Sequence, residues 1–196
     1  MQRLFALLFL VCALAASAAP ALAVEASEAP GAHPLAPGTT FPDVPLIGPV
    51  NAKAAAYLGV AEGKGATPVD AVKSEVLVVE IFSMYCPFCQ REAPNVNALY
   101  DLIDKRGLGN RIKVIGIGAG NSDVEVDIFR KKYDVPFPLF SDAEFDVHSK
   151  VGQVGTPFFY ILKKKPGSGF VVLHATLGAF GAPADFLSTI TRVAGL

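Results

Sequence analysis

Two cysteines separated by two residues are the side chains in this sequence with the most evident chemistry. Cys86 and Cys89 stand in the stretch SMYCPFCQREAP, residues 83–94. Thiols at this spacing can bind a metal ion, close a small disulfide-bonded loop, or exchange electrons as a dithiol–disulfide couple. The other residues of the chain discriminate among these three kinds of chemistry.

A metal site requires more ligands than this sequence supplies. Tetrahedral zinc takes four ligands, commonly two such cysteine pairs or one pair with two closely spaced histidines. The third cysteine, Cys12, lies in the N-terminal segment, and the histidines are scattered at His33, His148 and His174. We therefore expect no metal and no other cofactor.

A purely structural disulfide is also a poor explanation for the pair. In the loop-entropy model a closed loop of 15 residues stabilises a protein by about 3 kcal/mol, and a shorter loop contributes less. A redox role fits better, because a buried strand is expected just before Cys86 and a helix just after it. The helix dipole and free N–H groups at that position stabilise a thiolate on Cys86, while Cys89 follows one turn later.

The cysteines need a scaffold, and the hydrophobic pattern around them predicts an α/β fold. Residues 75–82, EVLVVEIF, form an almost continuous apolar run that is typical of a strand buried on both faces. A helix with one apolar face is expected from Pro87 to about Gly107, with a kink at Pro94.

Strands and helices continue to alternate along the rest of the chain. The expected elements are strands at 111–119, 157–164 and 169–177, a short strand at most at 137–140, and helices at 122–134, 143–152 and from about residue 182. Before the first buried strand we expect a possible helix at 51–60 and a turn at 61–68. Together these elements predict a central mixed β-sheet with helices on both faces.

The N-terminus predicts export from the cytoplasm. Arg3 precedes an apolar run that ends at about Ala16, and small residues up to an A-x-A site follow, which is the pattern of a secretory signal peptide. An uncleaved membrane anchor is the alternative, although the run is short for a membrane span. The expected divisions are a signal peptide at 1–23, a flexible lead-in at 24–40 and one domain at 41–196. The mature protein is then soluble in the periplasm or another extracytoplasmic compartment, where disulfides are permitted.

Composition indicates a folded domain without a strongly charged partner. Apolar residues make up 52% of the chain and charged residues 18%, which excludes a disordered chain. The net charge is −1, and no long block of like charge suggests nucleic acid. We expect a monomer that does not bind nucleic acid.

The stretch around the cysteines resembles the thioredoxin superfamily. VVEIFSMYCPFCQREAP contains the strand, an acidic residue (Glu80) six residues before the first cysteine, the CxxC pair, and a proline five residues after the second cysteine. VGTPFFYIL resembles the loop in which that superfamily places a cis-proline against the disulfide. The resemblance therefore implies a thioredoxin-like fold, a redox disulfide between Cys86 and Cys89, and a cis-proline at Pro157 preceded by Thr156.

Within the superfamily, the sequence is similar to the extracytoplasmic TlpA/ResA-type reductases. CPFCQREAP matches their C-x-x-C-x-x-E-x-P pattern, which places Glu92, and GTTFPDVPL is similar to the segment that opens those domains. The separation between the CxxC and the cis-proline implies one extra strand–helix unit, in addition to an N-terminal extension. A peroxiredoxin is not expected, because Val79 and Ser83 stand where the peroxiredoxin motif Pro-x-x-x-Thr-x-x-Cys requires Pro and Thr.

This resemblance implies a thiol–disulfide oxidoreductase that exchanges electrons with protein disulfides. The reductive direction is expected, with cytochrome c maturation as one setting and a membrane-embedded protein as the electron donor. Two alternatives stay open, because VEIFSMYCPFC also looks like the oxidase branch and Tyr85 stands where many relatives have Trp. These alternatives are a DsbA-like disulfide oxidase and a non-catalytic thioredoxin-fold module for binding or metal delivery.

Roles follow for the residues near the cysteines. Cys86 is the expected attacking thiol and Cys89 the resolving thiol. If Glu80 points inward, burial raises its pKa and suits it to move a proton to or from Cys89; otherwise it is an acid that reaches water. Glu92 either faces the active-site surface and modulates thiol acidity or only covers the helix.

An apolar lip beside the cysteines is expected to contact extended protein substrates. Its members are Tyr85, Pro87, Phe88 and Phe158. Partly buried packing is the alternative for these side chains.

Overall fold

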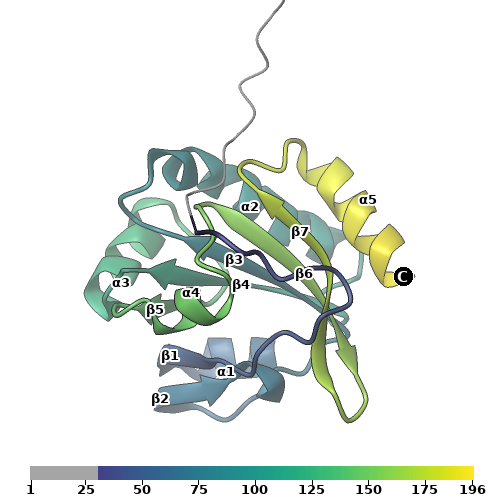
Figure 1. Cartoon of the computed structure of the whole chain (residues 1–196), viewed down its shortest axis with the longest axis horizontal. Helices are drawn as coiled ribbons and strands as arrows, with labels where there is room; N and C mark the ends of the chain where they lie inside the picture. The colour runs from purple at the N-terminus through teal and green to yellow at the C-terminus, as the bar shows by residue number, and fades with distance from the viewer. Residues whose placement is uncertain (1–30) are drawn as a thin grey trace, which may run out of the picture.

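The computed structural model describes residues 31–196, so the expected signal peptide and residues 24–30 of the lead-in lie outside the described residues. The described chain forms one seven-stranded mixed sheet with helices on both faces (Figure 1). The strands are β1 (Pro45–Val50), β2 (Gly63–Pro68), β3 (Val76–Phe82), β4 (Ile112–Ala119), β5 (Leu139–Asp142), β6 (Phe158–Lys165) and β7 (Gly169–Leu177). The helices are α1 (Ala52–Leu58), α2 (Pro87–Lys105), α3 (Asp123–Lys132), α4 (Asp146–Lys150) and α5 (Pro183–Ala194), with a 3-10 turn η1 (Val69–Ala71).

The strand order puts β3, the buried strand that precedes the cysteines, in the interior of the sheet. This order is β2-β1-β5-β4-β3-β6-β7, with β3 parallel to β4 and β4 parallel to β5. The remaining neighbours are antiparallel. Because β3, β4 and β5 run in the same direction, their carboxyl ends meet at one edge of the sheet, which we call the carboxyl edge.

Each face of the sheet has its own hydrophobic core. On one face, Leu77, Val79 and Ile81 of β3 pack with α1, α4 and the segment before β1. On the other face, Val76, Val78 and Phe82 pack with α2, α3 and α5. Side chains of a strand alternate between the two faces, so Glu80 lies on the same face as α2.

The thioredoxin-like fold predicted from the sequence is confirmed. Between α2 and β6 the chain makes two strand–helix units, β4–α3 and β5–α4, which supplies the expected extra unit. The possible helix at 51–60 is α1, capped by the Asn51 side chain, which accepts a hydrogen bond from the Ala54 N–H at 3.0 Å. Helix α2 is continuous from Pro87 to Lys105, with Pro94 inside it.

The turn predicted at 61–68 is wrong over most of its length. Residues 63–68 form β2, which pairs with the whole of β1 although it contains two glycines and a proline. An edge strand tolerates these residues, because one side of its backbone faces water and needs no partner. Residues 38–40 of the expected lead-in also contact the sheet, since the Gly38 N–H donates to Val172 and Thr40 forms a bridge with Val171 of β7.

Candidate active site

The first cysteine lies at the N-terminus of α2, as the sequence predicts. Cys86 is the N-cap residue, with φ −78° and ψ 116°, and Pro87 occupies the first helical position, where its missing N–H costs nothing. The Cys86 thiol is half-buried and donates a hydrogen bond to the Thr156 carbonyl oxygen at 3.1 Å. The sulfur is therefore held between the helix N-terminus and the loop before β6.

This position makes Cys86 more acidic than an ordinary thiol. Partial burial by itself raises the pKa of the Cys86 thiol, but hydrogen bonds to the sulfur outweigh burial and lower the pKa. The donors are the Thr156 hydroxyl, the Cys89 thiol and the backbone N–H groups of Phe88 and Cys89. Two of these four donors are backbone groups of the first helical turn, which are free because a helix leaves its first N–H groups unpaired.

The loop opposite Cys86 contains the expected cis-proline. The peptide bond between Thr156 and Pro157 is cis, which confirms the prediction from VGTPFFYIL. Pairing of β6 with β3 aligns Phe158 with Ile81, so the loop before β6 lies against the end of β3 from which the cysteine loop emerges. The sheet register therefore brings Thr156 to Cys86 across 70 residues of sequence.

The second cysteine has the opposite environment. Cys89 is fully buried in the core between the sheet and α2. Burial is the main cause that raises the pKa of the Cys89 thiol, and the charges of Glu80 and Cys86 raise it further. Both cysteines are free thiols here, so the geometry is that of the reduced pair. The two sulfurs therefore differ strongly in acidity and in access.

Glu80 points inward, which confirms one of the two alternatives for this residue. It is 3% exposed and lies between Val78 and Phe82 on the face that α2 covers. Within residues 31–196 its Oε1 atom has no hydrogen-bond partner. Burial, reinforced by the charge of Glu92, raises the pKa of Glu80 to about 8. A carboxyl with this pKa can hold or release a proton near neutral pH.

Glu92 is buried inside the protein. It therefore occupies neither of the two positions expected for it, the active-site surface and the outer surface of the helix. It is 3% exposed, and its carboxylate accepts hydrogen bonds from the Phe180 N–H and the Asn95 amide, each at 3.2 Å. Burial raises the pKa of Glu92, while these two hydrogen bonds lower it in part. Glu92 thus joins α2 to the loop between β7 and α5, and its charge helps to raise the pKa of Glu80.

The structure exposes the members of the expected lip that lie on the cysteine loop and buries the member that lies on the loop opposite. Tyr85 and Phe88 are each 64% exposed, and Pro87 is exposed between them. Phe158 is only 2% exposed, because its side chain turns to the core face of β6 and packs against Tyr160, with ring centroids 4.8 Å apart. The exposed lip therefore consists of Tyr85, Pro87 and Phe88.

Asn121 positions the cysteine loop, and the sequence analysis missed it. Its side chain is fully buried, and Oδ1 accepts a hydrogen bond from the Met84 N–H at 2.8 Å. The Gln90 amide donates to the Met84 carbonyl at 2.8 Å, and the Tyr85 hydroxyl donates to Glu125 of α3. The signal that could have found Asn121 is a polar residue directly after β4, because the carboxyl ends of neighbouring parallel strands lie side by side.

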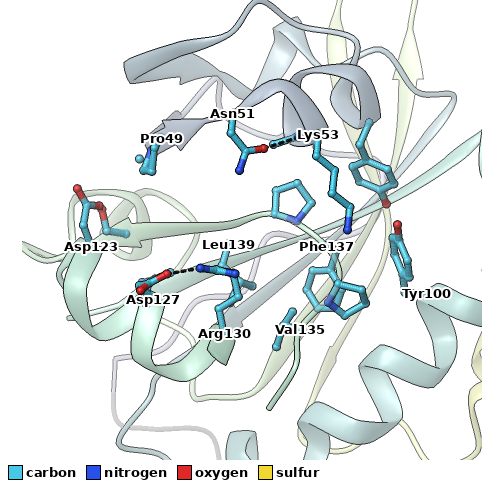
Figure 2. Close-up of a pocket in the computed structure, with 17 residues that line it drawn as sticks. Pro49, Asn51, Lys53, Tyr100, Asp123, Asp127, Arg130, Val135, Phe137 and Leu139 are labelled. Carbon is cyan, nitrogen blue, oxygen red and sulfur yellow. Dashed lines mark hydrogen bonds and ion pairs between the residues drawn. The ribbon is translucent and has the colours of Figure 1, made fainter. Parts of the chain in front are cut away.

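A separate cavity of about 230 Å³ lies between the β1–α1 segment and α3 (Figure 2). It exists because β1 and β5 pair at one position in the described chain, Ile47 with Ser141, and then separate. Pro49 and two prolines before β5 line the gap, and proline has no N–H to donate across it. Figure 2 shows Arg130 paired with Asp127, and the wall contains neither cysteine. The cavity is therefore distinct from the thiol site.

Among residues 31–196, no cluster of three or more His, Cys, Asp or Glu side chains could hold a metal ion. The thiol site thus consists of a half-buried acidic cysteine, a buried cysteine, a buried acid beside the second cysteine, and a cis-proline loop that contacts the first.

A mixed sheet with a CxxC pair at a helix N-terminus and a cis-proline opposite defines a redoxin of the thioredoxin fold. The sequence profile of the AhpC/TSA family matches residues 50–173, and the chain belongs to this family. The matched range contains both cysteines, Glu80 and the cis-proline.

Relatives of this chain agree with that placement. It is 25% identical over 92 residues to thiol-disulfide oxidoreductase ResA of Bacillus thuringiensis subsp. konkukian, covering 47% of this chain and 51% of the relative. The alignment thus spans about half the length of the curated relative. Together with the CxxC and cis-proline geometry, this match confirms the predicted resemblance to TlpA/ResA-type proteins.

Solved structures show the same fold at low sequence identity. A protein assigned as thiol:disulfide interchange protein DsbE from Chlorobium tepidum has a TM-score of 0.62 and 17% identity over 82% of this chain and 98% of its own. A secreted disulfide oxidoreductase of Mycobacterium tuberculosis, described as homologous to DsbE, has a TM-score of 0.50 and 20% identity, covering 68% of this chain and 90% of its own.

Proposed function

We propose that this protein is a thiol–disulfide oxidoreductase that exchanges electrons with protein disulfides through Cys86 and Cys89. The observation that carries this proposal is the asymmetry of the two sulfurs. Cys86 is accessible and has a lowered pKa, while Cys89 is buried and has a raised pKa. Such a pair suits a nucleophile that attacks a partner and a second thiol that later resolves the mixed disulfide.

In the reductive direction the Cys86 thiolate attacks one sulfur of the substrate disulfide. The substrate S–S bond breaks, one substrate sulfur becomes bonded to Cys86, and the other leaves as a thiolate that takes a proton from solvent. Cys89 then transfers its proton to the Glu80 carboxylate and attacks the Cys86 sulfur. The second substrate sulfur leaves and takes up that proton, so the substrate gains two electrons and two protons. The protein is left with a disulfide between Cys86 and Cys89.

Glu80 suits the proton transfer because of its burial. A pKa of about 8 means that both protonation states are accessible near neutral pH. An exposed glutamate, with the ordinary pKa of 4.5, would be a weaker base and would take the Cys89 proton less readily. The charge of Glu80 raises the pKa of the Cys89 thiol and is not among the causes that shift the pKa of Cys86, so its effect falls on the resolving step.

The exposed aromatic lip and the sequence relatives support the substrate class and the direction. Tyr85, Pro87 and Phe88 offer apolar surface beside Cys86, which suits an extended protein segment. The sequence resemblance to the TlpA/ResA-type reductases supports the reductive direction, cytochrome c maturation as one setting and a membrane-embedded electron donor. Among residues 31–196, every helix is too short or too polar to span a membrane. The export pattern of the N-terminus supports an extracytoplasmic location.

Reduction of insulin disulfides, followed with Cys86→Ser and Cys89→Ser, tests this proposal. The wild-type protein should reduce insulin, Cys86→Ser should abolish activity, and Cys89→Ser should accumulate a mixed disulfide. Equal activity in all three proteins would contradict the thiol mechanism. The direction is tested by equilibrating the pair with glutathione, because a reduction potential near the ~−120 mV of a strong oxidant would instead support a DsbA-like oxidase.

A further inference from the structure

Three loops emerge side by side at the carboxyl edge. They are residues 83–86 after β3, residues 120–122 after β4 and residues 143–145 after β5. Hydrogen bonds connect them, since Asn121 accepts from the Met84 N–H and the Gly120 N–H donates to the Asp142 carbonyl at 2.9 Å. The first loop contains the reactive thiol, so the other two form the surface beside it on the side away from the cis-proline loop.

The third loop presents an exposed aromatic ring. Phe145 is 48% exposed, and its ring covers Gly120 so closely that a Cβ atom there would lie 2.3 Å from the Phe145 Cζ atom. The middle loop offers no large exposed side chain here, because Gly120 has none and Asn121 is buried. Tyr85 on the first loop and Phe145 on the third are therefore the exposed rings at this part of the carboxyl edge, with the Phe145 ring over Gly120.

The backbone does not favour a phenylalanine at this position, although its ring packs over Gly120 and edge-on against His148, with ring centroids 5.6 Å apart. Phe145 has φ 60° and ψ 22°, in the left-handed region that favours Gly, Asn and Asp. It is also the N-cap residue of α4, where a polar side chain is preferred. The Asp142 carboxylate already accepts the Val147 and His148 N–H groups of that helix, at 3.0 and 2.8 Å. The sequence thus retains an exposed ring where the backbone disfavours it, which points to a binding role.

We propose that Phe145 recognises the substrate by binding an apolar side chain that follows or precedes the substrate's reacting cysteine. This inference rests on the proposed function and names the class of protein disulfide that the site prefers. Adjacent strands are about 4.8 Å apart, so two strand spacings separate the first loop from the third by about 10 Å. An extended segment covers this distance in about three residues.

The charge around Phe145 adds a second preference. Glu144 and Asp146 flank it in sequence, and both are exposed. Glu125, at the start of α3, is held near Tyr85 by the hydroxyl hydrogen bond. The basic groups of α4, His148 and Lys150, follow in its last turn. The preferred substrate segment therefore combines an aromatic or aliphatic residue about three positions from its cysteine with a lysine or arginine beside that residue.

Release of 2-nitro-5-thiobenzoate from peptide mixed disulfides tests this preference. The peptides carry Phe-Lys, Gly-Lys or Phe-Glu three residues after or before the cysteine, and 5,5′-dithiobis(2-nitrobenzoate) serves as the small substrate. With the reduced wild-type protein, one of the two Phe-Lys peptides, with the dipeptide either before or after the cysteine, should react faster than the other. We expect that peptide to react about tenfold faster than the Gly-Lys and Phe-Glu peptides that have the dipeptide on the same side. Phe145→Asn, which suits the left-handed conformation, should abolish the Phe preference and leave the rate with the small substrate unchanged.

Control variants separate recognition from folding. Phe145→Gly, which also fits the positive φ, should behave like Phe145→Asn. Val124→Asn removes another exposed apolar side chain, 68% exposed on α3, and should keep the Phe preference. Equal wild-type rates for the Phe-Lys and Gly-Lys peptides, or a Phe preference that survives in both Phe145 variants, would overturn the inference while thiol exchange itself persists. Failure of the wild-type protein to react with the small substrate would overturn the proposed function and this inference with it.

Discussion

Replacing Glu80 by Gln should make the stability of the protein depend less on pH. Glu80 has an ordinary pKa of 4.5 in an unfolded chain and a pKa of about 8 in the folded protein. Below pH 4.5 both states hold the proton, and the group has no effect on stability. Between these two values the unfolded chain releases the proton while the folded protein retains it, so native stability falls as pH rises.

The size of this effect follows from the pKa difference. Each pH unit in this range costs the wild-type protein about 1.4 kcal/mol, so the step from pH 5 to pH 7 costs about 3 kcal/mol. Glutamine has a similar shape and does not titrate. The free energy of unfolding of Glu80→Gln should therefore rise by about 3 kcal/mol relative to that of the wild type between pH 5 and pH 7. Above pH 8 the difference should become constant.

Guanidinium unfolding of the reduced proteins at pH 5, 6 and 7 measures the difference. Glu62→Gln, which changes an exposed glutamate, provides the matched control and should follow the wild-type pH dependence. If the free energies of unfolding of Glu80→Gln and the wild type differ by the same amount at pH 5 and pH 7, Glu80 is ionised in the folded protein. Burial would then not hold the proton on Glu80 near neutral pH.

Three further predictions concern the thiols, the cysteine loop and the lip. Iodoacetamide at pH 7 should label Cys86 at least tenfold faster than Cys89, as read by mass spectrometry; equal labelling would contradict the assigned roles. Asn121→Ala leaves the Met84 N–H without its partner and should cost about 1–3 kcal/mol of stability, together with a slower reaction of Cys86 with 5,5′-dithiobis(2-nitrobenzoate). Unchanged denaturation and kinetics would show that Asn121 does not position the loop. Phe158→Ala should cost about 3–5 kcal/mol because the side chain is buried, whereas Phe88→Ala should change stability by less than about 0.5 kcal/mol; similar losses for both would contradict the observed burial.

Local patterns in the sequence were sufficient for the central part of the fold. The apolar run before the cysteines could only be a buried strand, and the helix after it follows from its spacing of apolar residues. The inward position of Glu80 was one of two open alternatives, because an acid in this strand could still have reached water near the strand end; β3 is instead buried on both faces along its whole length. The cis-proline at Pro157 came from resemblance and not from any physical pattern.

The errors have a common physical origin in long-range packing. Phe158 was expected in the lip, but both faces of β6 are covered at this position, so its side chain is buried, and this coverage could not be read from one strand alone. The buried position of Glu92 depends on the Phe180 N–H, which lies 88 residues further along the chain. Asn121 acts through a loop from a different strand. Such contacts are fixed only when the order of strands in the sheet is known.

The gap between β1 and β5 divides the backbone hydrogen bonding of the sheet into two sections. Strands β5, β4, β3, β6 and β7 form a continuous ladder, while the β1–β2 hairpin joins this ladder through the pair Ile47–Ser141 and through side-chain packing. Few ladder hydrogen bonds therefore hold the hairpin to the rest of the sheet, and its attachment rests on buried side chains such as Leu46 and Val50. All the groups around the thiols belong to the continuous section, so a displacement of the hairpin leaves the backbone ladder that carries the redox centre intact.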